Sequence, residues 1–196
     1  SGYGLTECPI IAMNTTRCAP EKLANTEGRV NPPEGQMRIV TLAGEEAGPG
    51  VEGEIRAFGP QLFKGYVDPS LDETAFDEQG FFRTGDLGYL DEDGYIVITG
   101  RLKDVIIRKG ENISAQEIED LLYPHPKIAD VAVIGLPDAA SGERVCAVVQ
   151  CAPGETLEFD EMVAFLLERE LMKQKLPEQL ELIEEIPRNP AGKILK

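Results

Sequence analysis

The chain has 196 residues, of which 42% are hydrophobic and 28% charged, a composition typical of a soluble globular protein of one or two domains. Its formal net charge of −16 argues against a nucleic-acid surface, because the basic residues are scattered and only Arg108 and Lys109 are adjacent. No apolar run approaches the roughly 18 to 20 residues of a membrane span. No signal peptide opens the sequence, so we expect a cytoplasmic protein.

The cysteines and the single histidine also exclude several kinds of site. Cys8, Cys18, Cys146 and Cys151 lack the paired spacing of zinc ligands. If residues 144–151 form a strand, the last two cysteines point to opposite faces, which excludes a bridge between them. His125 lies between two prolines and is predicted to be a turn residue. A single histidine argues against a serine or cysteine hydrolase, because such an enzyme needs a well-oriented imidazole.

Short strands separated by turns dominate the first half of the chain. Residues 1 to about 35 lack a clean period, and "NPPEG" (31–35) predicts a turn. "GQMRIVT" (35–41) and "GEIRAFG" (53–59) predict strands, and "DLGYLDEDGYIVITG" (86–100) predicts a hairpin around Asp93 and Gly94. We therefore expect residues 1–102 to form a small, mostly antiparallel, barrel-like β unit.

The pattern changes near residues 101–104, and the rest of the chain predicts a compact α+β domain over residues 103–196. Ser114 opens a capping box, and the apolar positions that follow it predict a helix. A second amphipathic helix is predicted from Phe159 onwards. The predicted strands are two short ones in "VIIRKGENI" (105–113), then "IADVAVIG" (128–135), "RVCAVVQC" (144–151) and "QLELIEEI" (179–186).

Four stretches combine polar side chains with glycine, and each is a weak signal when taken alone. They are "YGLTE" (3–7), "RTGDL" (83–87), "GRLKD" (100–104) and "NPAGK" (189–193). The last lacks the spacing of a phosphate loop, so an exposed lysine in a terminal loop is the simplest interpretation. The prolines and Gly192 around it predict a short, flexible loop that carries Lys193.

The order and spacing of these stretches together resemble the C-terminal portion of the adenylate-forming superfamily, which includes acyl-CoA synthetases, luciferases and peptide-synthetase adenylation domains. The matching motifs are "GYGLTECP" (2–9), residues 80–119 and "IPRNPAGKILK" (186–196), and the resemblance covers essentially the whole chain. It implies that residues 1–102 end the large AMP-binding domain and that residues 103–196 are the C-terminal lid domain. In this family the phosphate-binding loop and most of the acyl pocket precede "YGLTE", so we expect a fragment that is inactive when isolated.

The resemblance also implies a role for each motif residue of the first unit. Tyr3 would stack on adenine, Thr6 would contact phosphate, and Glu7 would hold Mg²⁺ through a hard carboxylate oxygen. Asp86 would accept hydrogen bonds from the ribose hydroxyls, and Arg101 would donate to the same ribose.

For the second unit the resemblance implies one catalytic residue, a hinge and a CoA site. Lys193 would bridge the substrate carboxylate and the α-phosphate of ATP. Lys103 would be the hinge about which the lid domain rotates between adenylation and thioester formation. Gly110 would let the pantetheine arm of CoA approach the backbone, and Arg108 and Lys109 would contact the CoA phosphates.

The resemblance predicts an AMP-forming carboxylate–CoA ligase that uses ATP, Mg²⁺ and CoA in fatty acid metabolism. "GENISAQEIE" (110–119) resembles acyl-CoA ligases more than peptide-synthetase adenylation domains. A peptide-synthetase-type adenylation domain and a non-catalytic binding module of the same fold stay open as alternatives. The sequence leaves open which acid is used and the oligomeric state, a homo-oligomer included.

Overall fold

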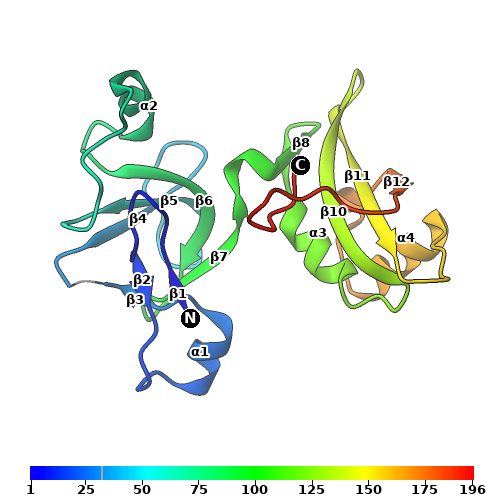
Figure 1. Cartoon of the computed structure of the whole chain (residues 1–196), viewed down its shortest axis with the longest axis horizontal. Coiled ribbons are helices and arrows are strands. Elements are labelled where there is room, and N and C mark those ends of the chain that lie inside the picture. Colours follow the sequence, from blue (N-terminus) through cyan, green and yellow to red (C-terminus); the bar gives the residue numbers. More distant parts are fainter. Residues whose placement is uncertain (32) are drawn as a thin grey trace. The chain divides into compact units, whose positions relative to one another are not determined.

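The computed structural model describes residues 1–31 and 33–196 and consists of two compact units, Ser1–Leu102 and Lys103–Lys196 (Figure 1). The division falls inside the stretch at residues 101–104 where the sequence pattern changes. Pro32, part of the turn predicted at residues 31–35, lies outside the described residues. No helix in the described ranges is both long and apolar enough to cross a membrane.

The first unit opens with three very short antiparallel strands. These are β1 (Gly2–Tyr3), β2 (Ala12–Met13) and β3 (Arg29–Val30), with α1 (Pro20–Asn25) between the last two. Strands of two residues carry no detectable alternation, which explains why residues 1 to 35 showed no period.

A four-stranded antiparallel meander makes up the rest of the first unit (Figure 1). Its strands, in spatial order, are β4 (Gln36–Val40), β5 (Gly53–Phe58), β6 (Phe82–Leu90) and β7 (Ile96–Arg101). The connection from β5 to β6 holds the 3₁₀ turn η1 (Pro69–Leu71) and α2 (Asp72–Ala75). The predicted antiparallel β unit is confirmed, and it is open, because no strand pairing in the described residues closes either sheet into a barrel.

The predicted hairpin around Asp93 and Gly94 is confirmed. The carboxylate of Asp91 accepts backbone hydrogen bonds from Asp93 at 2.9 Å and from Tyr95 at 2.8 Å, which closes the turn between β6 and β7. The hairpin register places Asp86 directly opposite Arg101. Both sheets contribute to one apolar core, whose buried members are Tyr3, Cys8, Ile11, Ala12, Ile39, Ile55, Ala57 and Ile96.

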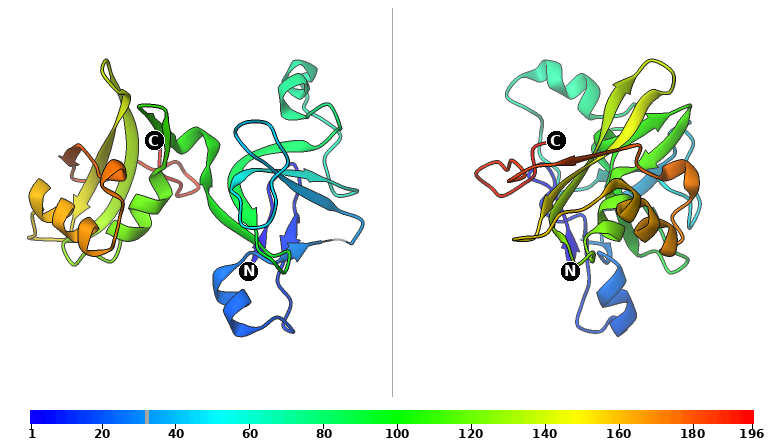
Figure 2. Two further views of the ribbon diagram at one scale, coloured as in Figure 1. Left: turned by 180° about the vertical axis from the view of Figure 1, so that it is seen from behind. Right: turned by 90° about the vertical axis from the view of Figure 1, so that its right-hand side faces the viewer.

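The second unit is an α+β domain, as predicted, with helices packed on a mostly antiparallel sheet (Figure 2). After the 3₁₀ turn η2 (Leu102–Asp104), its elements are β8 (Val105–Arg108), β9 (Glu111–Ser114), α3 (Ala115–Leu122), β10 (Ile128–Asp138), β11 (Gly142–Cys151), α4 (Phe159–Glu168), η3 (Lys173–Lys175) and β12 (Gln179–Leu182). β11 pairs with β10, β8 and β12, and the pairing with β12 is parallel.

Several local predictions for this unit are confirmed, although the last strand, predicted over residues 179–186, ends at Leu182. The Ser114 hydroxyl accepts the Glu117 N–H at 3.3 Å, which caps α3. His125 lies in the turn after α3 and its ring packs on Phe165, and burial lowers the pKa of His125. All four cysteines are free thiols, with Cys146 buried and Cys151 partly exposed.

Helix α4 offers a matched test of the core. Leu166 is fully buried and its neighbour Leu167 is 40% exposed, so the two leucines share one helix and differ in packing. Leu166→Ala is expected to lower the free energy of unfolding of this unit by about 2–5 kcal/mol, because it leaves a cavity. Leu167→Ala should cost about 0.5 kcal/mol or less. Urea unfolding followed by circular dichroism measures both, and equal losses would contradict the assigned core.

Candidate active site

A buried carboxylate joins three of the predicted site residues of the first unit. Tyr3 Oη donates to Asp86 Oδ2 at 2.7 Å, and Arg101 Nε lies 3.0 Å from Asp86 Oδ1. The three residues come from β1, β6 and β7, and 83 positions separate the first two. The structure thus brings together the residues predicted to bind adenine and ribose.

The strand pairing explains how Asp86 is held. Its carboxylate faces Arg101 across the β6–β7 ladder, and its N–H donates to the Thr84 hydroxyl at 3.1 Å. The same hydroxyl donates to the Ile55 carbonyl on β5 at 2.7 Å. Asp86 is therefore fixed from two sides, while the Arg101 side chain stays 44% exposed and is open to a ligand.

Tyr3 is placed to orient Asp86. Burial, followed by the nearby Asp86 charge, strongly raises the pKa of Tyr3, so its hydroxyl stays protonated and donates to the carboxylate. The Tyr3 residue is 7% exposed and belongs to the apolar core. A ring this buried offers little surface to a stacked base, so its contact with adenine stays a prediction.

The motif residues Thr6 and Glu7 lie in a tight loop. Its ends are joined by backbone hydrogen bonds between Leu5 and Cys8, of 2.9 and 3.2 Å. Thr6 is exposed, and Glu7 Oε1 accepts a hydrogen bond from Tyr66 Oη at 3.0 Å. Tyr66 is a partner that sequence reasoning missed, since it lies 59 residues away and no local pattern marks it.

Lys193 lies on a hydrogen-bonded hairpin of the second unit, whereas the sequence predicted a flexible loop. The Asn189 N–H donates to the Lys193 carbonyl at 2.9 Å, and the Leu195 N–H donates to the Pro187 carbonyl at 2.9 Å. Gly192 takes a φ of +80° in the turn, a conformation that favours glycine. The Lys193 side chain is exposed and has no hydrogen-bond or ion-pair partner among residues 1–31 and 33–196.

The residues predicted to contact CoA lie on or beside the β8–β9 hairpin. Lys109 and Gly110 form its turn, both with positive φ, and a Cβ added at Gly110 would point into open space. Arg108 is already engaged, since it donates to Glu178 at 2.8 Å and to the Gln174 carbonyl at 2.9 Å. These bonds favour a structural role for Arg108 over the predicted phosphate contact. The predicted hinge residue Lys103 is exposed in η2.

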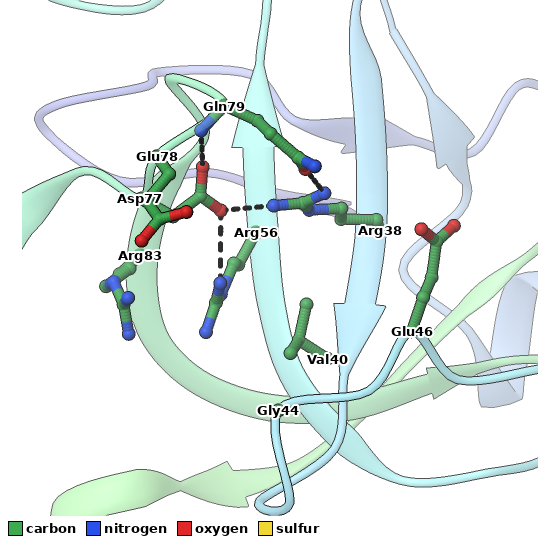
Figure 3. A pocket seen from close by; sticks show the side chains of 9 residues that line it. All are labelled: Arg38, Val40, Gly44, Glu46, Arg56, Asp77, Glu78, Gln79 and Arg83. Carbon is green, nitrogen blue, oxygen red and sulfur yellow. Dashed lines mark hydrogen bonds and ion pairs between the residues drawn. The ribbon is translucent and has the colours of Figure 1, made fainter.

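A separate depression of about 330 Å³ on the first unit contains none of the predicted site residues (Figure 3). Asp77 lies there between Arg38 and Arg56, which come from neighbouring strands. Burial acts to raise the pKa of Asp77, but hydrogen bonds from Arg38, Arg56 and backbone N–H groups lower it to about 2. The arginines already have a carboxylate partner, so this cluster ties the sheet together.

Two protein-family models match this chain, one in each unit. A model described as AMP-binding enzyme matches residues 1–67, and one described as AMP-binding enzyme C-terminal domain matches residues 117–193. The chain belongs to the adenylate-forming superfamily. Membership of this family, inferred from the motifs, is thereby confirmed.

Individual relatives in this superfamily align with most of the chain. The medium-chain fatty-acid–CoA ligase of Escherichia coli (strain K12) is 47% identical over 82% of the chain and 29% of its own length. The salicyl-AMP ligase/salicyl-S-ArCP synthetase of Mycobacterium tuberculosis is 42% identical over 94% of the chain and 33% of its own length. The chain therefore spans about a third of the length of these curated relatives.

A solved structure in the same superfamily has the same fold. ATP-bound MatB from Rhodopseudomonas palustris matches with a TM-score of 0.88 and 35% identity, over 98% of this chain and 38% of MatB. The α+β fold is thereby confirmed for both units.

Proposed function

We propose that the whole protein containing this chain is an AMP-forming carboxylate–CoA ligase. Residues 1–102 would then close the large AMP-binding domain, and residues 103–196 would be the lid domain. The observation that carries the proposal is the Tyr3–Asp86–Arg101 arrangement, a fixed carboxylate beside an exposed guanidinium in a member of the adenylate-forming superfamily. The 47% identity to a fatty-acid–CoA ligase supports CoA as the acceptor.

In the first half-reaction, an oxygen of the acid attacks the α-phosphorus of ATP and pyrophosphate leaves, which forms an acyl-adenylate. Asp86 accepts hydrogen bonds from the ribose hydroxyls, and the exposed Arg101 donates to the same sugar. Lys193 brings its charge to the carboxylate and the α-phosphate, where negative charge develops in the transition state. Its side chain, which has no partner among the described residues, suits this task because no contact has to be broken.

A magnesium ion fits the residues present. Among residues 1–31 and 33–196, no three histidine, cysteine or acidic side chains are grouped so that they could hold a metal. Mg²⁺ commonly binds through one or two carboxylates together with substrate phosphates and water. Glu7 would supply that carboxylate, positioned by Tyr66, and the ion would neutralise charge on the phosphates of ATP.

In the second half-reaction, the CoA thiolate attacks the acyl carbonyl and AMP leaves. The β8–β9 hairpin supports this role through its turn, because the open space at Gly110 leaves room for an extended chain close to the backbone. Lys103 would be the hinge about which the lid domain rotates, so that the β8–β9 hairpin takes the place of the Lys193 hairpin at the reacting groups. Cytoplasmic location belongs to the same proposal, as the compartment in which CoA and ATP are available to it.

A second acceptor is favoured by one observation. The M. tuberculosis relative, whose name includes salicyl-S-ArCP synthetase, aligns with 94% of the chain at 42% identity. A carrier-protein thiol would react as the CoA thiol does, so the two candidates share the first half-reaction and differ in the second.

The proposal is tested with the whole protein, ATP, Mg²⁺ and a panel of fatty and aromatic acids. We expect acid-dependent release of pyrophosphate, followed by thioester formation when CoA is added. Asp86→Asn should raise the ATP concentration for half-maximal rate by about tenfold to a hundredfold, the scale of a charged hydrogen bond. Thioester formation only with a carrier protein would favour the second acceptor. ATP binding without pyrophosphate release from any acid would identify a non-catalytic module.

A further inference from the structure

Arg188 makes two contacts that hold the turn before Lys193. Its Nη1 donates to the Gly192 carbonyl at 2.7 Å, inside the hairpin. Its Nη2 donates to Asp130 Oδ2 on strand β10. One guanidinium therefore links the turn that carries Lys193 to the sheet of the second unit.

The strand end of this link is held by the sheet and by a local hydrogen bond. Asp130 pairs with Gln150 in the β10–β11 ladder, and its other carboxylate oxygen accepts the Val131 N–H at 3.0 Å. The Asp130 side chain is only 13% exposed, whereas that of Arg188 is 42% exposed. The carboxylate is thus a fixed anchor, and the hydrogen bond from Arg188 to it raises the pKa of Arg188.

The turn end of the link acts on the lysine through the backbone. Arg188 bonds the Gly192 carbonyl, and this carbonyl and the Lys193 N–H belong to the same peptide group. That N–H donates to Asn189 Oδ1 at 2.9 Å, and Asn189 Oδ1 also accepts the Ala191 N–H at 3.0 Å. Both sides of the Gly192–Lys193 peptide are therefore bonded, so the direction of the Lys193 Cα–Cβ bond depends on Arg188 as well as on Asn189.

We propose that Arg188, anchored by Asp130, is a positioning residue for Lys193. This inference rests on the proposed function, because it assumes that Lys193 acts in adenylation. The planar fork of arginine donates in two directions at once, which the single ammonium of lysine does not reproduce in the same geometry. Loss of the Arg188–Asp130 contact would let the turn shift, and a displacement of about 1 Å at a reacting group costs up to about a hundredfold in rate.

The kinetic test compares Arg188→Ala, Arg188→Lys and Asp130→Asn in the whole protein. We expect each to lower kcat for pyrophosphate release by about tenfold to a hundredfold, with the KM for ATP unchanged. Thioester formation from supplied acyl-adenylate should keep its rate. The matched control is Glu161→Gln, which breaks the Lys127–Glu161 pair of 2.7 Å elsewhere in the same unit and should change neither rate. A rise in KM with unchanged kcat, or equal loss in the control, would overturn the inference.

A double variant separates positioning from general damage. If Arg188 acts only through Lys193, adding Arg188→Ala to Lys193→Ala should lower adenylation no further. A further tenfold loss in the double variant would show an independent role for Arg188 and refute the inference.

Hydrogen exchange provides a readout that does not depend on activity. Arg188→Ala and Asp130→Asn should speed amide exchange at Ala191 and Lys193 by tenfold or more, while exchange in β10 and β11 stays unchanged. Unchanged exchange in the turn would show that Arg188 and Asp130 do not hold it. If exchange rises as expected but Lys193→Ala leaves adenylation intact, Arg188 holds the turn but the proposed role of Lys193 fails, and the positioning inference fails with it.

Discussion

Replacing Lys193 by alanine is expected to slow adenylation in the whole protein by about a hundredfold or more. The exposed ammonium is the charge that the proposal places at the α-phosphate, and losing one preorganised contact of this kind costs on the order of 100- to 1,000-fold in kcat. Thioester formation from supplied acyl-adenylate should survive, because the lysine has no task in that step. Separate assays of the two half-reactions measure both effects.

The control for this experiment is Lys173→Ala. Lys173 is also an exposed lysine of the second unit, in η3, and is not part of the Lys193 hairpin. It should leave both half-reactions unchanged. An equal loss of rate in both half-reactions with Lys193→Ala would contradict the proposal that this lysine acts in adenylation alone.

Replacing Lys103 by proline is expected to separate the half-reactions in the opposite way. Lys103 is the first residue of the second unit, and a rotation between units needs one or two residues whose φ and ψ change. Proline fixes φ near −65° and also restricts the residue before it, so it should trap one orientation. If that orientation is the adenylating one, acyl-adenylate forms normally and transfer to CoA falls by about tenfold or more.

Lys103→Ala is the matched control, because it removes the side chain and keeps the backbone free. It should be mild in both assays, since the Lys103 side chain is exposed. Normal CoA transfer by the proline variant would mean that Lys103 lies on a static connection, and the alternating-lid hypothesis would have to be abandoned.

Local signals in the sequence were enough for most elements of the second unit and for the β6–β7 hairpin of the first. Ser114 caps α3 through an N–H three residues away, and the turn at Asp91–Tyr95 closes on one carboxylate. Such contacts depend on neighbours in the chain, so residue type and spacing reveal them. The motif residues Asp86, Arg101 and Lys193 were located in the same way, by short patterns in a fixed order.

Contacts between distant residues were decided by the tertiary structure alone. Whether the sheets of the first unit close into a barrel depends on how their edge strands pair, which no local pattern encodes. In the part of the chain that the structure describes, no pairing closes them. The parallel pairing of β12 with β11 is another long-range choice.

The same division applies to the candidate site. The sequence by itself determined which residue types are present: a carboxylate, a guanidinium and a lysine behind a glycine, each in a recognisable motif. Only the tertiary structure decided what holds them, since Tyr3 meets Asp86 across 83 positions, Tyr66 meets Glu7 across 59, and Arg188 meets Asp130 across 58. The physical reason is that a motif specifies chemistry within a few residues, whereas the supporting hydrogen bonds form only when packing of the whole unit brings distant strands together.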